Sequence, residues 1–230
     1  MDNKCEQFKK AFKATLPVMA GYIVLGMGFG IVLKVRGYSL LWALAMSVFI
    51  YAGSMQFVAI DLLTGGASLI TTALTTLMVN ARHLFYGISM VDKYKDMGKI
   101  KPYLIFSLTD ETYSLVCRDD GDPKAKKRYY TLVSAMNHCY WVTGSVLGAA
   151  IGGIIPFSVD GIDFALTALF VTVFVEQWAS TKDHLPALTG VICSVICLLI
   201  FGSENFLIPT MILITVSLTV LKKIRGKKHE

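Results

Sequence analysis

The sequence predicts an all-α protein, a polytopic bundle of helices in a membrane. Hydrophobic residues make up 54% of the 230 residues and charged residues 17%, whereas about a quarter of the residues in a typical soluble domain are charged. Long uncharged runs separate the charged patches, and basic residues gather near both ends, within residues 4–13 and 222–228. Such runs are typical of helices that cross a hydrocarbon core of roughly 30 Å.

Eight apolar segments are predicted along a single membrane domain, residues 1–230. They are residues 14–33, 40–63, 68–91, 103–117, 130–155, 164–179, 185–201 and 206–221. The first follows a basic stretch but has no convincing small-residue cleavage site, so we expect a retained span rather than a signal peptide. The fourth is short and carries Asp110 and Glu111, so it either spans or is re-entrant or broken. The predicted number of segments is therefore seven or eight.

The distribution of basic residues predicts the orientation. With eight spans and a cytoplasmic N-terminus, fifteen lysines and arginines lie inside, six lie outside, and Arg82 is within a span. This asymmetry follows the positive-inside rule. The same rule accounts for the net charge of +6, so no nucleic-acid partner is predicted.

A weak internal repeat is a second interpretation of the pattern, with units 14–117 and 130–221. Glycines at similar spacing precede a turn in each half: Gly21, Gly26 and Gly30 before Gly37, and Gly144, Gly148 and Gly152 before Gly161. Secondary transporters often contain such repeats, with broken helices and a substrate site at their interface. The alternative is that glycines four residues apart let two helices pack closely.

No enzyme or cofactor signature is present. The five cysteines form no CxxC pair, so neither a disulfide framework nor a metal site is predicted. HExxH, GxSxG, Walker A and dinucleotide-binding patterns are absent. We therefore expect neither an enzyme nor a bound cofactor.

Polar residues interrupt the third segment in MVNARHLFYG, residues 78–87. Ionisable side chains within a span usually face protein or water and mark a functional path. On a continuous helix Asn80 and His83 share one face, and Arg82 shares another with Tyr86. Arg82 could bind a carboxylate and His83 could relay a proton. The alternative is that the span ends at Val79 and Arg82 extends to the interface.

The second segment contains YAGSMQF, residues 51–57. Its small residues, including Ser54, can break a helix and expose backbone groups to a zwitterion, while Gln56 adds an amide. Close helix packing, with Gln56 bonded to a neighbouring helix, is the alternative.

Two further motifs carry carboxylates. In SLTDETY, residues 107–113, Asp110 and Glu111 could form a cation or proton site, and Thr109 is a predicted helix N-cap. Glu176, at the end of a long apolar run, is a candidate proton carrier or an interfacial residue.

The order of these motifs resembles the AzlC family of branched-chain amino-acid permeases. The resemblance is carried by Pro17, the following glycines, AGSMQF at 52–57, NARH at 80–83 and TDET at 109–112. It implies an inner-membrane exporter of leucine, isoleucine and valine, with methionine as a further candidate, driven by the proton gradient. It also implies a small separate membrane subunit of the AzlD type. The functional candidates that it transfers are Gln56, Asn80, Arg82, His83, Asp110 and Glu111.

Together these observations predict a transporter subunit with a site near the middle of the bilayer. The substrate-binding candidates are Arg82, Gln56, Asn80 and Ser54, and the proton-coupling candidates are Glu176, Asp110, Glu111 and His83. As a hypothesis, Arg82 or the N-terminus of a broken helix binds the substrate carboxylate. A channel or passive pore for small solutes is the alternative function.

Overall fold

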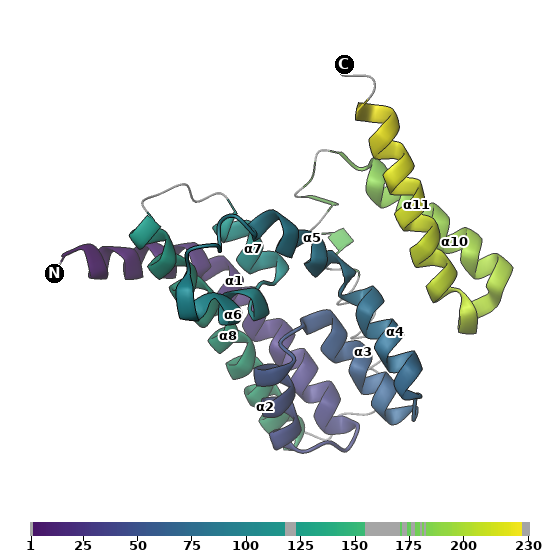
Figure 1. Cartoon of the computed structure of the whole chain (residues 1–230). Helices are drawn as coiled ribbons and strands as arrows, with labels where there is room; N and C mark the ends of the chain where they lie inside the picture. Colours follow the sequence, from purple (N-terminus) through teal and green to yellow (C-terminus); the bar gives the residue numbers. More distant parts are fainter. Residues whose placement is uncertain are drawn as a thin grey trace. The chain divides into compact units, whose positions relative to one another are not determined.

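The computed structural model describes residues 2–117, 123–154 and 183–226, with a few isolated positions between 171 and 181. The regular elements in these ranges are helices, which confirms the all-α class (Figure 1). Two compact units, residues 1–166 and 167–230, divide the chain. The predicted segment 164–179, with Glu176, lies largely outside the described residues.

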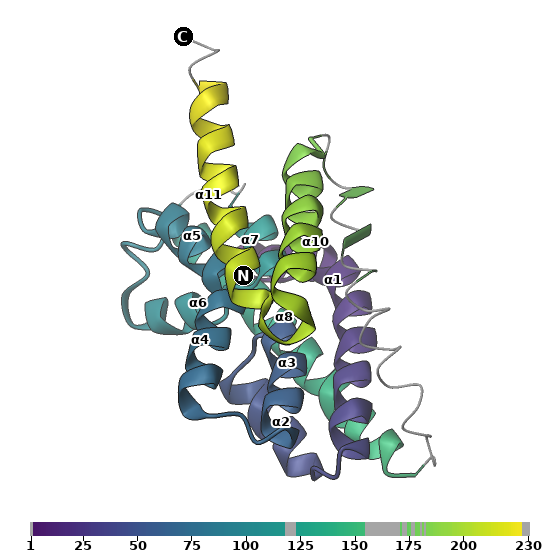
Figure 2. The same ribbon diagram turned by 90° about the vertical axis from the view of Figure 1, so that its right-hand side faces the viewer.

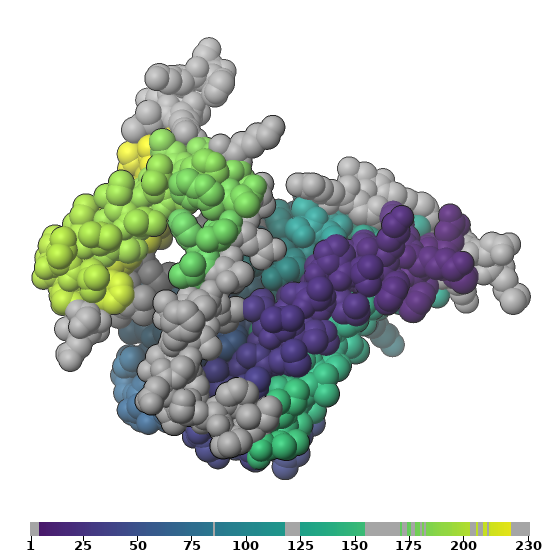
Figure 3. Space-filling model, turned by 180° about the vertical axis from the view of Figure 1, so that it is seen from behind, coloured from purple at the N-terminus to yellow at the C-terminus, as the bar shows by residue number. Residues whose placement is uncertain are grey.

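Two long helices, α1 (Asp2–Val35) and α8 (Pro123–Gly152), form the frame of the first unit. They lie side by side in Figures 1 and 3. A Cβ atom at Gly30 would overlap the backbone of Ser145, and one at Gly148 would overlap the backbone of Met27. The glycine spacing therefore serves close helix packing, while an internal repeat remains a prediction.

Three of the predicted segments are each broken into two helices. Residues 40–63 form α2 (Leu40–Phe49) and α3 (Gly53–Thr64), and residues 68–91 form α4 (Leu69–Val79) and α5 (Ala81–Met90). Residues 101–116 form α6 (Lys101–Phe106) and α7 (Asp110–Val116), preceded by the short 3₁₀ helix η1 (Gly98–Ile100).

The first two breaks are local departures from helical geometry. Between α2 and α3 the chain turns at Tyr51, which has a φ of 45°, a conformation uncommon outside glycine. This confirms the predicted break in YAGSMQF. Between α4 and α5 the backbone leaves the helical region at Asn80, with φ −93° and ψ 4°. Asparagine competes for backbone hydrogen bonds and favours helix ends, so a continuous helix through residues 78–87 is wrong.

The breaks also explain why the number of spans remains a prediction. Individually, two of the described helices are long and apolar enough to cross a membrane, over Cys5–Val35 and Leu185–Gly202. The broken segments contribute two shorter helices each, and these fall below the length of about 20 residues that a single span requires.

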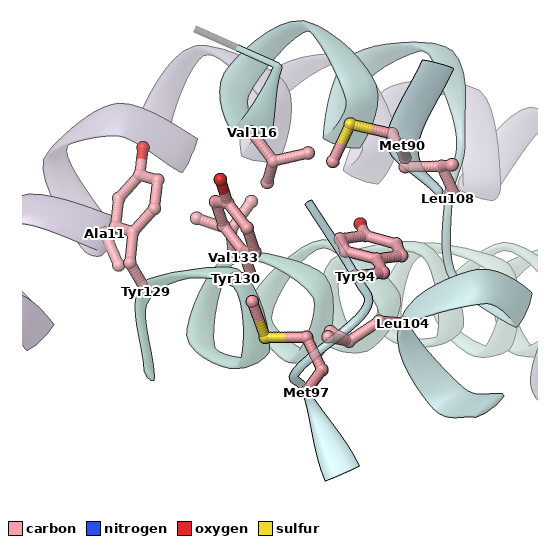
Figure 4. Close-up of a cluster of buried hydrophobic side chains, with 10 residues drawn as sticks. All are labelled: Ala11, Met90, Tyr94, Met97, Leu104, Leu108, Val116, Tyr129, Tyr130 and Val133. Carbon is pink, nitrogen blue, oxygen red and sulfur yellow. The ribbon is translucent and has the colours of Figure 1, made fainter. Parts of the chain in front are cut away.

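A buried apolar cluster fills the space between α1, α6, α7, α8 and the chain that leaves α5 (Figure 4). Five of its members are each at most 5% exposed: Met90, Tyr94, Met97, Leu104 and Val116. The cluster fixes the end of α5 against α6, which positions one wall of the site described below. Its other members are Ala11, Leu108, Tyr129, Tyr130 and Val133.

The second unit contains the helices α10 (Leu185–Asn205) and α11 (Leu207–Gly226), which lie side by side (Figures 1 and 2). The backbone of α10 departs from helical geometry at Gly202, with φ 72°. Cys193 and Cys197 are buried, and Cys193 Sγ lies 3.8 Å from Ser217 Oγ on α11. Both cysteines therefore serve as small packing residues, as the sequence predicted.

Replacing Gly30 by valine is expected to destabilise the protein, because the new side chain would overlap the backbone of α8. Overpacking of this kind typically costs about 1–3 kcal/mol. Gly28→Val is the matched control on the same helix, since a Cβ at Gly28 meets no atom of the described residues within 4 Å. The apparent Tm in detergent should fall for Gly30→Val and change little for Gly28→Val. Equal Tm values for the two variants would contradict the close helix contact.

Candidate functional site

The three helix breaks meet at a cavity of about 440 Å³ within the first unit. Ile50, Tyr51 and Ala52 line it from the first break, Asn80 from the second, and Leu108 from the third. The other lining residues are His83, Gly87, Met90, Val91, Tyr94, Lys101, Ile105 and Phe106. This volume is within the usual range for sites that bind small molecules.

The cavity walls are mostly apolar, with polar groups at the breaks. Asn80 Oδ1 is buried and has no hydrogen-bond partner in the part of the chain that the structure describes. His83 Nδ1 lies 3.2 Å from the carbonyl oxygen of Asn80. A buried acceptor without a partner is costly in a folded protein, so Asn80 is a candidate contact for a bound donor.

Helices α3 and α5 begin at this cavity. Their N-cap residues, Ala52 and Asn80, make no side-chain capping bond, whereas Ser68 caps α4 and Thr109 caps α7. The first backbone N–H groups of a helix have no partner within the helix and attract anions. Ala52 and Asn80 line the cavity, so the N-termini of α3 and α5 lie at its wall.

Arg82 joins the first turns of three helices. Its Nη1 lies 2.6 Å from Asp110 Oδ2, and its Nη2 donates to Ser54 Oγ at 2.8 Å. Ser54 is in the first turn of α3, Arg82 in that of α5, and Asp110 is the first residue of α7. In this structure the carboxylate partner of Arg82 is thus a protein group, and Arg82 is not among the residues that line the cavity.

Glu111 belongs to a separate hydrogen-bonded group between α1 and α7. The Tyr22 hydroxyl donates to Glu111 Oε2 at 2.6 Å and lies 2.7 Å from the hydroxyl of Thr109. Thr109 Oγ1 also accepts from the backbone N–H of Thr112, which confirms the predicted N-cap. Asn137 of α8 donates to the hydroxyl of Thr112 at 3.0 Å. The TDET motif is therefore bound to both long helices.

Gln56 is completely buried and bonded to neighbouring side chains. Its Oε1 accepts from Trp141 Nε1 at 2.9 Å, and its Nε2 donates to Ser47 Oγ at 3.3 Å. Gln56 is thus bonded to a neighbouring helix, which was one of the two alternatives from the sequence. The bond to Trp141 links α3 to α8.

Comparison with known proteins identifies the family. Residues 17–155 match the AzlC protein family. The branched-chain amino acid transport protein AzlC of Bacillus subtilis is 44% identical over 217 residues, which cover 94% of this chain and 85% of that protein. The chain belongs to the AzlC family. An uncharacterized membrane protein of Helicobacter pylori is 40% identical over 94% of this chain and 95% of its own length.

More distant AzlC relatives extend the comparison. The inner membrane protein YgaZ of Escherichia coli is 30% identical over 74% of this chain and 73% of that protein. No solved structure matches the chain. AzlC is a family of membrane transport proteins, so the prediction of a protein that is not an enzyme is confirmed.

In this AzlC protein the described site candidates separate into four groups. Asn80 and His83 line the cavity. Ser54, Arg82 and Asp110 form the cluster that joins three helices. The remaining described candidates, Gln56 and Glu111, lie in two further hydrogen-bonded groups.

The sequence analysis did not single out Tyr51, Gly87 or Tyr22. Tyr51 and Gly87 line the cavity of the AzlC protein, and both belong to motifs that were quoted for other residues. Tyr22 lies on α1 and approaches Glu111 only through the fold. No local pattern distinguishes it from an ordinary aromatic residue in an apolar helix.

The Arg82–Asp110 pair is expected to be energetically coupled. Because the two side chains are 40% and 21% exposed, each alanine variant should lose about 1 kcal/mol of stability, the upper range for exposed ion pairs. The double variant Arg82→Ala/Asp110→Ala should then be less destabilised than the sum of the single variants. The apparent Tm of the four proteins in detergent measures this coupling.

The control is the same cycle at Arg36 and Asp61, whose charged atoms lie 3.9 Å apart and where the Asp61 side chain is 57% exposed. We expect a smaller coupling there. Additive effects at Arg82 and Asp110 would show that the pair does not hold α5 to α7.

Proposed function

We propose that this protein transports branched-chain amino acids across a membrane and binds them in the cavity at the three helix breaks. The observation that carries the proposal is the cavity itself, which combines apolar walls with two uncapped helix ends. Discontinuous helices with such ends bind the charged groups of substrates in many secondary transporters. The name of the Bacillus subtilis relative supports the choice of substrate.

The carboxylate, the ammonium group and the side chain of an amino acid each contact a different part of the cavity. The N-termini of α3 and α5, whose N-cap residues line the cavity, bind the carboxylate, and Asn80 Oδ1 accepts from the ammonium group. The branched side chain lies against the apolar residues, among them Met90, Ile105 and Phe106. Arg82 acts as a structural connector in this scheme, because Asp110 and Ser54 already occupy its guanidinium.

Export driven by the proton gradient is the proposed direction and energy source. His83 lines the cavity, so its protonation would directly affect a bound ammonium group. Glu111 is hydrogen-bonded to Tyr22 away from the cavity lining, and it is a second proton carrier. Asp110 and Glu176 complete the set of proposed carriers.

A small membrane subunit of the AzlD type is the proposed partner, in a multi-pass inner-membrane complex with the N-terminus in the cytoplasm. The family resemblance supports the partner and the location, and the asymmetry of basic residues supports the orientation. Co-expression with an AzlD-type subunit should increase leucine efflux from cells.

Asn80→Ala should reduce leucine transport, because the ammonium group would lose its acceptor. We expect at least a tenfold loss of leucine exchange in proteoliposomes, since an unpaired charged group weakens binding strongly. Exchange needs no ion gradient and therefore measures substrate binding apart from proton coupling. Thr76→Ala is the matched control one turn earlier on α4, because its hydroxyl donates within its own helix, to Thr72 O.

The wild-type protein is measured with and without the partner subunit. Absence of amino-acid exchange in both preparations of folded protein would overturn the proposed function. Leucine flux that a protonophore leaves unchanged in the presence of a pH gradient would instead favour a channel or passive pore.

Glu111→Gln is expected to separate proton coupling from substrate exchange. The amide keeps the size of the carboxylate but cannot release a proton, so leucine exchange without a gradient should continue. Transport driven by a pH gradient should fall at least tenfold. Glu6→Gln, at an exposed position of α1, is the control. Unchanged gradient-driven transport in Glu111→Gln would exclude Glu111 as the proton carrier.

A further inference from the structure

One stripe of α5 forms a wall of the cavity. Asn80, His83, Gly87 and Met90 line it at intervals of three and four residues, so they share a face of the helix. Gly87 lies at the centre of this stripe. At Gly87 only backbone atoms form the cavity wall, whereas the other three residues contribute side chains.

The fold itself gives no reason for a glycine at this position. Within the part of the chain that the structure describes, a Cβ atom added to Gly87 meets no atom within 4 Å, and the φ of Gly87 lies outside the left-handed region. Gly30 and Gly148 differ, because another helix backbone occupies the space beside them. Glycine within a helix is less favourable than alanine by roughly 1 kcal/mol, so the space beside Gly87 is kept open at a cost in helix stability.

Open space beside Gly87 is part of the volume available to a ligand. The neighbouring lining residues, Met90, Ile105 and Phe106, are apolar, so an aliphatic side chain is the group that this region accommodates. A side chain at residue 87 would extend into the same volume without displacing protein atoms.

We infer that Gly87 is a specificity-determining residue, which sets the largest amino-acid side chain that the cavity accepts. This inference rests on the proposed function. With glycine the cavity admits leucine and isoleucine. With alanine or valine at residue 87 it admits only smaller aliphatic side chains. In apolar pockets one methylene group changes discrimination by about tenfold or more.

The test is amino-acid exchange in proteoliposomes by the full chain, with Gly87→Ala and Gly87→Val as variants. Radiolabelled valine is exchanged against unlabelled alanine, valine, leucine, isoleucine or methionine. We expect Gly87→Val to lose exchange of leucine and isoleucine at least tenfold relative to alanine, with a smaller loss in Gly87→Ala. Gly21→Ala and Gly21→Val are matched controls, because Gly21 is exposed, also has open space around it and does not line the cavity.

The outcomes distinguish this inference from the proposed function. If the wild-type protein exchanges leucine and the Gly87 variants lower all substrates equally, or none, Gly87 does not set the size limit and the proposed function stands. If the wild-type protein exchanges no amino acid, both are overturned. The apparent Tm of each variant is also measured, and misfolding of Gly87→Ala would show that the space beside Gly87 is not free.

Discussion

The close contact between α1 and α8 is the constraint on which the rest of the first unit depends. Gly30 and Gly148 allow the two backbones to meet without intervening side chains. Small residues permit such approach in membranes, where packing rather than exclusion of water holds helices together. The pair then presents Tyr22 and Trp141 to the broken helices, and each of these residues bonds a different one: Tyr22 bonds Glu111 of α7, and Trp141 bonds Gln56 of α3.

Polar side chains of α1 and α8 bond to the segments around the helix breaks. A break leaves backbone carbonyl and amide groups without helical partners, which is costly where no water is present. His138 of α8 lies with its Nε2 3.2 Å from the Ser47 carbonyl oxygen near the end of α2, and its ring packs 4.3 Å from the ring of Tyr51. The turn at Tyr51 is thus supported from α8.

Local features of the structure were predictable from the sequence, and contacts between distant segments were not. Composition predicted the all-α class, the small residues of YAGSMQF predicted a break, and Thr109 predicted an N-cap, because each depends on neighbouring residues. The helix end at Val79 was only an alternative in the sequence, since the apolar run continues on both sides of Asn80. The sequence also could not indicate that Asp110, 28 residues away, lies against Arg82, and substrate binding by Arg82 stays a prediction. The absence of a side chain at Gly87 gave no signal, since a cavity exists only in three dimensions.

The cluster at Arg82 has a mechanical consequence. One guanidinium holds both Ser54 of α3 and Asp110 of α7, so the starts of α3, α5 and α7 are bound to a common point. Movement of any one of these helix starts either carries the other two with it or breaks a bond to Arg82. The starts of these three helices are therefore expected to move together, because Arg82 bonds to both Ser54 and Asp110.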